Sequence, residues 1–286
     1  MSGQFRTLVA VSELAQQLGA PGWRVVDCRH DLVNPGFGRN VYAEAHIPGA
    51  VFLSLDDDLS GPKTGHNGRH PLPDPAALAR RLGELGIDNR TQVIAYDDAG
   101  GMYAARLWWM LRWLGHDEVA VLDGGYRAWC AAGQPVSPVL PERSPATFSF
   151  LAREGMAADV AEVQDKLAAH AMCLIDARSP DRFRGENESL DPVAGHIPGA
   201  SNRFFRDNLD EDGRFRPAGE LRADFSVIIG ELPPEAVIHQ CGSGVTACHN
   251  LLAMEHAGLY GSRLYPGSWS EWCADPSRPV ATGNEA

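Results

Sequence analysis

The stretch that decides the fold is "AVIHQCGSGVTACHN" at residues 236–250. An apolar run is followed by Cys241, by two glycines within three residues, and by a segment of helical composition. This order predicts a buried strand at 236–240, a tight turn at 241–246 and a helix from residue 247. Because glycine allows torsions that other residues avoid, the turn can curl and aim N–H groups at its centre.

Those N–H groups and the start of the following helix favour negative charge at the centre of the turn. The turn therefore stabilises the Cys241 thiolate, which is the reactive form of the thiol. The alternative interpretation is that Cys241 is a small buried residue with a purely structural role, which is common for a free cysteine.

The same landmarks recur in the same order in both halves of the chain. The matched pairs are "VVDCR" at 25–29 and "LIDAR" at 174–178, "AHIPGAVF" at 45–52 and "GHIPGASN" at 195–202, "QVIAYDDAGGMYAARL" at 92–107 and "AVIHQCGSGVTACHNL" at 236–251, and "LDGGYRAW" at 122–129 and "YPGSWSEW" at 265–272. The separation in sequence between the two members of each pair is far longer than a solenoid repeat, so the pattern predicts a duplicated domain. We expect an N-terminal domain at 1–135, a Pro/Ser-rich linker at 136–155 and a C-terminal catalytic domain at 156–286.

Short β-branched runs alternate with longer amphipathic stretches in each half. The expected strands are 24–28, 92–96, 118–122, 173–177 and 236–240, and the expected helices are 74–85, 102–115, 156–170 and 247–258. This alternation predicts an α/β fold in which each half is a parallel sheet flanked by helices. Ligands of such sheets bind at the carboxyl ends of strands, which is where Cys241 lies.

Composition excludes several classes of function. A net charge of -12 disfavours a nucleic-acid surface. We expect no signal peptide, no membrane segment and therefore a cytoplasmic protein. The six cysteines show neither disulfide nor zinc spacing, and no phosphate-binding loop is present, so no metal or cofactor is expected. The predicted core cysteines are Cys28, Cys130, Cys173 and Cys273.

Comparison of the two halves separates chemistry from structure. Asp97 stands at the position of Cys241 in the first half, so the fold does not require cysteine there. Arg182 has no basic counterpart in the first half, which makes it a candidate for binding an anion rather than one more surface arginine.

Residues present in both halves are interpreted as structural. These are His46 and His196, and Arg29 and Arg178, which Asp27 and Asp176 are expected to hold by ion pairs.

These features resemble the tandem-domain rhodanese, or sulfurtransferase, family, in which only the C-terminal domain carries the catalytic cysteine. The resemblance covers both "HIPGA" segments, "DARSPDRFRG", the cysteine loop and "GSWSEW". The loop sequence "CGSGVTA" resembles that of 3-mercaptopyruvate sulfurtransferases, whereas thiosulfate-using rhodaneses carry Arg and Lys in place of Gly242 and Ser243. The resemblance implies two rhodanese-like domains.

The resemblance also implies roles for particular residues. Cys241 would take sulfur from a small-molecule donor as a covalent persulfide, and a thiol such as thioredoxin or a small thiol, or cyanide, would remove it. Ser243, His70 and Asp56 match a proton relay, although Asp57 and Asp58 adjoin Asp56. Arg182 matches the arginine that binds the donor's carboxylate in this family. The backbone of the loop would stabilise the persulfide through Gly242, Gly244, Val245, Thr246 and Ala247.

One departure concerns the donor. Mercaptopyruvate enzymes carry a second arginine between the "DARSPDRFRG" segment and "GHIPG", but "GENESLDPVAG" at 185–195 contains none. Either Arg184 compensates or the donor is another thiol compound. The nearest alternative is a thiosulfate:cyanide sulfurtransferase, and a non-catalytic rhodanese-fold binding module is a third interpretation. A related Cys-loop phosphatase is disfavoured because position 247 is alanine where the phosphate-clamping arginine would stand.

Overall fold

The computed structural model describes residues 4–142, 144–169 and 171–284, and the chain divides into two compact units. The first unit contains residues up to Gly61, Pro73–Arg153 and Glu211–Arg214. The second contains Pro62–Leu72, Glu154–Asp210 and the chain from Phe215 onward. Each unit is a parallel sheet flanked by helices, which confirms the predicted fold class. The continuous domain boundaries expected from the sequence remain a prediction.

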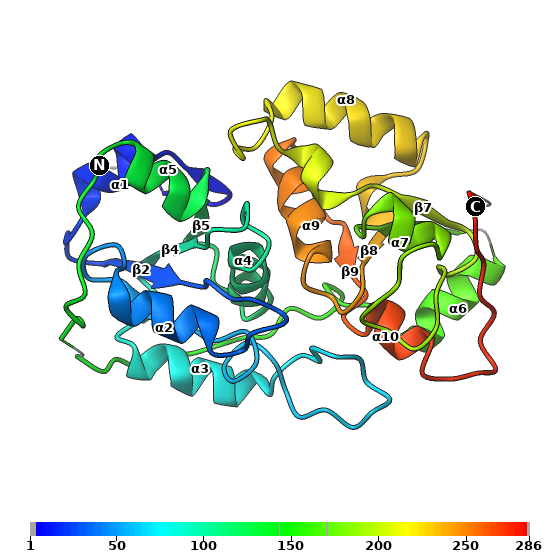
Figure 1. The fold of residues 1–286 in the computed structure, drawn as a ribbon, viewed down its shortest axis with the longest axis horizontal. Coiled ribbons are helices and arrows are strands. Elements are labelled where there is room, and N and C mark those ends of the chain that lie inside the picture. The colour runs from blue at the N-terminus through cyan, green and yellow to red at the C-terminus, as the bar shows by residue number, and fades with distance from the viewer. Residues whose placement is uncertain (1–3, 143, 170, 285–286) are drawn as a thin grey trace. The chain divides into compact units, whose positions relative to one another are not determined.

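The first unit is built on a five-stranded parallel sheet (Figure 1). Its strand order is β1 (Leu8–Val9), β5 (Val119–Leu122), β4 (Gln92–Tyr96), β2 (Trp23–Asp27) and β3 (Val51–Phe52). Helices α1 and α5 lie on one side of the sheet, and α2 and α3 lie on the other. The helices are α1 (Val11–Gln17), α2 (Phe37–Glu44), α3 (Pro75–Glu84), α4 (Ala104–Trp113) and α5 (Gly125–Ala131).

Local sequence explains the ends and faces of these helices. Helix α3 begins where the Asp74 carboxylate accepts the Ala77 N–H at 2.8 Å, and Pro75 occupies the first turn, where no N–H donor is needed. Leu14 of α1 and Trp129 of α5 are fully buried and pack in one cluster with strand residues of the sheet. Burying such side chains stabilises the unit by roughly 2 kcal/mol each.

The second unit contains a four-stranded parallel sheet. Its strand order is β7 (Ala200–Asn202), β6 (Cys173–Asp176), β8 (Val237–Gln240) and β9 (Arg263–Leu264). Helices α6 and α10 lie on one side, and α8 lies on the other (Figure 1). The helical elements are α6 (Val160–Ala168), α7 (Pro180–Arg184), η1 (Phe205–Asn208), α8 (Ala218–Ile229), η2 (Pro234–Ala236), α9 (Ala247–His256) and α10 (Ser268–Trp272).

The residues shared by both halves are structural, as predicted. Arg178 donates to both oxygens of Asp176 at 2.7–3.1 Å and to the Gly195 carbonyl at 2.8 Å. Arg29 and Asp27 form the same pair in the first unit, with the shortest contact at 2.6 Å. Each pair is buried, so removing one partner would leave an uncompensated charge in the core.

The two "HIPGA" histidines also have structural partners. The Nδ1 atom of His46 lies 2.7 Å from the Tyr42 carbonyl, and that of His196 lies 2.8 Å from the Phe183 carbonyl. Both imidazoles are fully buried, and His196 stacks on the Phe183 ring at 3.7 Å between centroids. These contacts fix the turn that leads into the edge strand of each sheet.

Two of the four predicted core cysteines are confirmed as buried. All six cysteines are free, and Cys28 and Cys273 are buried as expected, whereas Cys173 is only partly buried. Cys130 is exposed, so its assignment to the core was wrong. It follows the buried Trp129 on the short helix α5, and a neighbouring position on a helix points about 100° away.

The described part of the chain contains neither a membrane-spanning helix nor a cluster of metal-ligating side chains. No helix there is both long enough and apolar enough to cross a membrane. No group of three or more His, Cys, Asp and Glu side chains within the same residues is arranged to hold a metal ion.

A buried histidine gives the second unit a testable acid sensitivity. His239 on β8 is fully buried, its Nε2 lies 3.1 Å from the Met254 sulfur, and burial lowers its pKa to about 3. The folded protein therefore disfavours the protonated imidazole. The stability that follows is present above pH 6.5 and is lost as the pH falls from 6.5 toward 3.

We predict that His239→Leu weakens this pH dependence. Between pH 7.5 and 5, the wild type should lose about 2 kcal/mol more free energy of unfolding than the variant. Denaturant titrations at several pH values measure the difference, and His66→Leu, at an exposed position, serves as the matched control. Parallel pH profiles for wild type and His239→Leu would contradict the assignment.

Candidate active site

The predicted strand, turn and helix around Cys241 are all present. Strand β8 ends at Gln240, the turn follows, and α9 begins at Ala247. Cys241 is 2% exposed, and the Gly244 N–H donates to its sulfur at 3.1 Å. Gly244 has a φ of 75°, and a Cβ there would lie 2.5 Å from the Pro266 carbonyl oxygen, so the turn requires glycine at this position.

Residues 265–270, which we call the support segment, are hydrogen-bonded to the backbone of the loop. The Cys241 N–H donates to Ser268 Oγ at 3.1 Å, and the Trp269 N–H donates to the Cys241 carbonyl at 3.0 Å. The Ser270 N–H donates to the Gly242 carbonyl at 2.9 Å. These hydrogen bonds fix both the N–H and the carbonyl groups at the start of the loop. The Gly244 N–H, further along the loop, points at the Cys241 sulfur.

Ser268 adopts a backbone conformation that is costly for serine. Its φ is 55°, whereas the matching residue of the first half is Gly125, with a φ of 59°. Holding a non-glycine residue in this region costs roughly 1 kcal/mol. The hydroxyl that accepts the Cys241 N–H accounts for a serine at this position, because glycine has no acceptor to offer.

The structure brings His70 and Ser243 together. His70 Nδ1 lies 2.7 Å from Ser243 Oγ, and both side chains are buried. The segment that carries His70 is bound to the support segment, where the Arg69 N–H donates to Ser270 Oγ at 3.0 Å. Gly68 also lies against Gly267 so closely that a Cβ would stand 2.7 Å from its carbonyl oxygen. The serine–histidine part of the predicted relay therefore has hydrogen-bonding geometry.

Asp56 belongs to the first unit, in the turn after β3. Its Oδ2 lies 3.9 Å from His30 Nε2. Its two neighbours are engaged by arginines: Asp57 with Arg39 at 3.2 Å, and Asp58 with Arg81 at 2.8 Å. The place of Asp56 in the relay stays a prediction.

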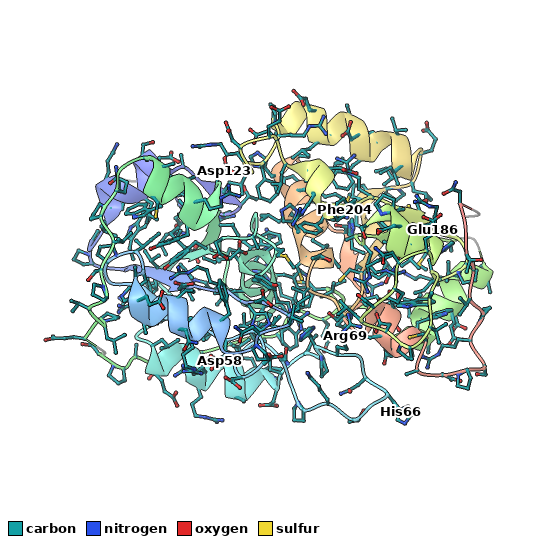
Figure 2. All side chains as sticks on the ribbon, viewed as in Figure 1. Asp58, His66, Arg69, Asp123, Glu186 and Phe204 are labelled. Carbon is teal, nitrogen blue, oxygen red and sulfur yellow. The ribbon has the colours of Figure 1, made fainter. Side chains whose placement is uncertain are left out.

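Two guanidinium groups stand over Gly242. A Cβ built on Gly242 would lie 3.5 Å from Arg182 Nη2 and 2.8 Å from Arg69 Nη2. Arg182 therefore lies at the loop, as predicted. Arg69 was missed by the sequence analysis, and Figure 2 places it beside α10 in the second unit. Its only sequence signal is that it precedes His70.

Two buried carboxylates neutralise these arginines. Glu188 accepts from Arg182 Nη2 at 2.9 Å with each oxygen and also lies 3.5 Å from Arg178. Asp191 pairs with Arg69 through one oxygen and lies 3.4 Å from Arg182 through the other. Both carboxylate side chains are at most 3% exposed. The "GENESLDPVAG" segment thus supplies counter-charges where a second arginine was expected.

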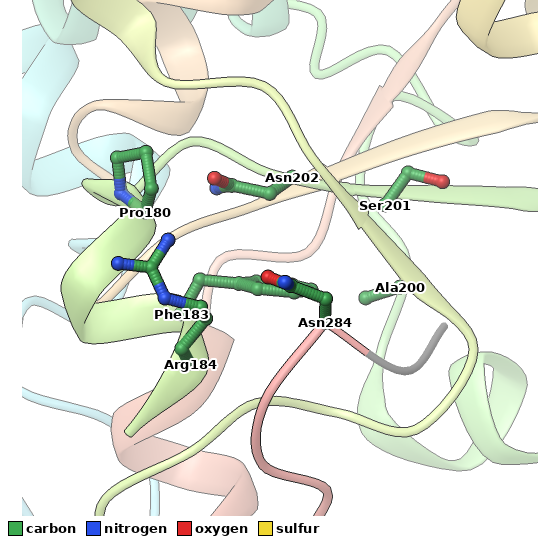
Figure 3. A pocket seen from close by; sticks show the side chains of 7 residues that line it. All are labelled: Pro180, Phe183, Arg184, Ala200, Ser201, Asn202 and Asn284. Atoms are coloured by element: carbon green, nitrogen blue, oxygen red, sulfur yellow. The ribbon is translucent and has the colours of Figure 1, made fainter. Parts of the chain in front are cut away.

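Arg184 does not fill the role suggested for it. It donates to Glu186 at 2.7 and 2.8 Å and lines a separate pocket of about 270 Å³ (Figure 3). That pocket is bounded by α7, strand β7 and Asn284, and no residue of the cysteine loop lines it. The second guanidinium at Gly242 comes from Arg69 instead.

The remaining loop residues lead into α9. The Cys248 N–H donates to the Val245 carbonyl and the His249 N–H to the Thr246 carbonyl, each at 3.1 Å. Val245 is buried, and Ala247 begins the helix. Persulfide stabilisation by Gly242, Val245, Thr246 and Ala247 stays a prediction.

The matching loop of the first unit is filled by a carboxylate. Asp97 accepts backbone N–H groups from Ala99, Gly101, Tyr103 and Ala104 at 2.8–2.9 Å, and its side chain is fully buried. The repeated loop therefore surrounds a carboxyl group with N–H donors in the first half, where the matching position has no cysteine.

Comparisons with known proteins agree with this geometry. The rhodanese-like domain model matches residues 10–132 and 159–275. A probable 3-mercaptopyruvate sulfurtransferase of Pseudomonas aeruginosa is 49% identical over 97% of this chain and 98% of its own. A putative thiosulfate sulfurtransferase of Mycobacterium tuberculosis is 38% identical over 99% of each chain. The solved 3-mercaptopyruvate sulfurtransferase of Leishmania major has a TM-score of 0.82 and 33% identity, covering 93% of this chain and 74% of that one.

Two domain matches and relatives of this identity define the class of protein. The chain belongs to the rhodanese family and is a tandem rhodanese-domain sulfurtransferase.

The two loop glycines should respond differently to alanine. In Gly242→Ala the new methyl meets the flexible end of Arg69, so we expect KM for an anionic donor to rise about fivefold, equivalent to about 1 kcal/mol. In Gly244→Ala the methyl meets backbone at a positive φ, so we expect kcat/KM to fall at least about 100-fold. Steady-state kinetics of the two variants measure this contrast, and equal losses would contradict it.

Proposed function

We propose that the protein transfers sulfur from 3-mercaptopyruvate, through a persulfide on Cys241, to a thiol or to cyanide. The observation that carries the proposal is the 2.7 Å contact between His70 Nδ1 and the Oγ atom of Ser243, which lies two residues after Cys241 in sequence. Mercaptopyruvate carries a thiol proton that must move during the reaction. A serine hydroxyl bonded to an imidazole can relay a proton, whereas a lysine at this position would mainly supply charge.

The first half-reaction forms the persulfide. The Cys241 thiolate attacks the sulfur of mercaptopyruvate, a sulfur–sulfur bond forms, and the carbon–sulfur bond breaks. The electron pair of the broken bond goes to carbon as the enolate of pyruvate, which takes up the proton released by the substrate thiol. In this proposal Ser243 and His70 carry that proton. The products are pyruvate and a Cys241 persulfide anion.

The loop would hold the charge of that persulfide. The Gly244 N–H already lies 3.1 Å from the Cys241 sulfur, and further backbone donors of residues 242–247 would serve the outer sulfur. Arg182 and Arg69 would orient the donor's carboxylate from above Gly242.

The second half-reaction regenerates the thiolate. An incoming thiolate or cyanide attacks the outer sulfur, the sulfur–sulfur bond breaks, and its electron pair returns to Cys241. The acceptor is proposed to be thioredoxin, a small thiol or cyanide. Alternation of the two half-reactions predicts ping-pong kinetics.

Thiosulfate is the second candidate donor. Two guanidinium groups at Gly242 supply positive charge that the loop sequence lacks, and thiosulfate is a dianion. A relative at 38% identity is also named as a putative thiosulfate sulfurtransferase. Against thiosulfate stand the neutralising carboxylates Glu188 and Asp191, which leave little net charge at the site.

The experiment that tests the proposal compares both donors with cyanide as acceptor. We expect kcat/KM for mercaptopyruvate to exceed that for thiosulfate by at least about tenfold. A preference for thiosulfate would reject mercaptopyruvate as the donor and support the second candidate. Failure with both donors would reject both.

Ser243→Ala separates the two donors further. Removing the hydroxyl interrupts the proton relay, so kcat with mercaptopyruvate should fall by about 100-fold. Thiosulfate has no thiol proton to transfer, so any turnover with thiosulfate should change by less than about threefold and serves as an internal control. An equal loss with both donors would mean that Ser243 supports the loop rather than the proton transfer.

A further inference from the structure

We propose that Asp191 is a specificity-determining residue that restricts the active site to donors of single negative charge. The proposal rests on the proposed function, because it concerns the charge of the sulfur donor that reaches Cys241. It assigns a role to a residue that occupies the stretch where a second arginine was expected.

Asp191 is the counter-ion that Arg69 and Arg182, the two arginines above Gly242, share. One of its carboxylate oxygens accepts from Arg69 Nη1, and the other lies 3.4 Å from Arg182 Nη2. The Asp191 side chain is 2% exposed, so water screens its charge little. A change at Asp191 therefore changes the potential felt by any anion bound above Gly242.

Glu188 has a different position in the cluster. It binds Arg182 through both oxygens, lies 3.5 Å from Arg178, and accepts the Leu190 N–H at 2.8 Å. Those contacts fix the fold of its own segment. Asp191 is thus the carboxylate whose removal changes local charge with least loss of backbone support.

The formal charges of the cluster cancel. Arg69 and Arg182 contribute two positive charges, and Glu188 and Asp191 contribute two negative charges. Arg178, which also faces Glu188, is compensated by Asp176. The guanidinium groups therefore still offer donors to a carboxylate, but the net field does not favour a second negative charge on the ligand.

Burial also affects the charge of Asp191. It raises the pKa of the Asp191 carboxyl, while the hydrogen bond and charge of Arg69 oppose the rise. The carboxylate form thus depends on the arginines that it neutralises.

The first test uses Asp191→Asn and measures the reactivity of Cys241 without any sulfur donor. Iodoacetate is an anion and iodoacetamide is its neutral analogue, so the ratio of their alkylation rates reports the local potential at Cys241. Peptide mass spectrometry isolates Cys241 from the exposed Cys130. We expect this ratio to rise about threefold in Asp191→Asn, since the interaction energy scales with the charge on the reagent.

Two control variants separate charge from structure. Glu186→Gln removes one negative charge from an exposed pair with Arg184 and should leave the ratio unchanged. Asp191→Glu keeps the charge and should also retain the wild-type ratio.

A further pair of variants covers the case in which Asp191→Asn does not fold. Arg69→Gln should lower the ratio about threefold, and the double variant Arg69→Gln/Asp191→Asn, which restores neutrality, should return to the wild-type ratio. A double variant with the low ratio of Arg69→Gln would overturn the proposal.

The second test uses the donors themselves. In Asp191→Asn, kcat/KM should rise about tenfold for the dianion thiosulfate and about threefold for the monoanion mercaptopyruvate. An unchanged donor ratio together with an unchanged alkylation ratio would overturn the role of Asp191. If the wild-type enzyme rejects mercaptopyruvate, the proposed function fails, whereas the alkylation ratio still decides whether Asp191 sets the local potential.

Discussion

Both units contain an anion-binding backbone loop at the carboxyl end of an inner strand. In the first unit four N–H groups bind the Asp97 carboxylate, and in the second the Gly244 N–H is aimed at the Cys241 sulfur. A buried anion is stable only when donors are fixed in advance, because rearranging them at the moment of need would cost free energy. The duplicated fold thus places backbone N–H donors around a buried side chain twice, and only the second of these loops carries a cysteine.

Holding such a loop in place requires support from elsewhere in the second unit. The support segment binds the Cys241 and Gly242 backbone and also carries the segment of Arg69 and His70. One segment therefore holds both the Cys241 loop and the segment of Arg69 and His70 in place. The strained backbone of Ser268 is consistent with this role, since strain persists where surrounding contacts over-determine a conformation.

Much of this arrangement could be predicted from the sequence. The internal repeat located the loop, and β-branched runs located the buried strands, because parallel strands and glycine-rich turns leave local patterns. The comparison of Asp97 with Cys241 leads to the prediction that Cys241 serves chemistry rather than the fold. Local patterns also identified Arg182 and the Asp27–Arg29 type of pair.

Arg69 and the counter-ions could not be found in that way. Arg69 contacts residues about 120 and 200 positions away in sequence, so no local pattern marks it. Asp191 and Glu188 belong to an acidic segment that reads as solvated surface, yet both are buried against arginines. The prediction that Cys130 lies in the core was wrong because the apolar composition around α5 does not indicate which side of so short a helix faces water.

The central claim is that Cys241 itself carries the sulfur between donor and acceptor. The most direct test is mass spectrometry of the protein after exposure to mercaptopyruvate without an acceptor. The account predicts one added sulfur atom, located on the Cys241 peptide, that is lost when cyanide is added and is absent in Cys241→Ser. Sulfur transfer to cyanide by Cys241→Ser, or an added sulfur on any other cysteine, would contradict it.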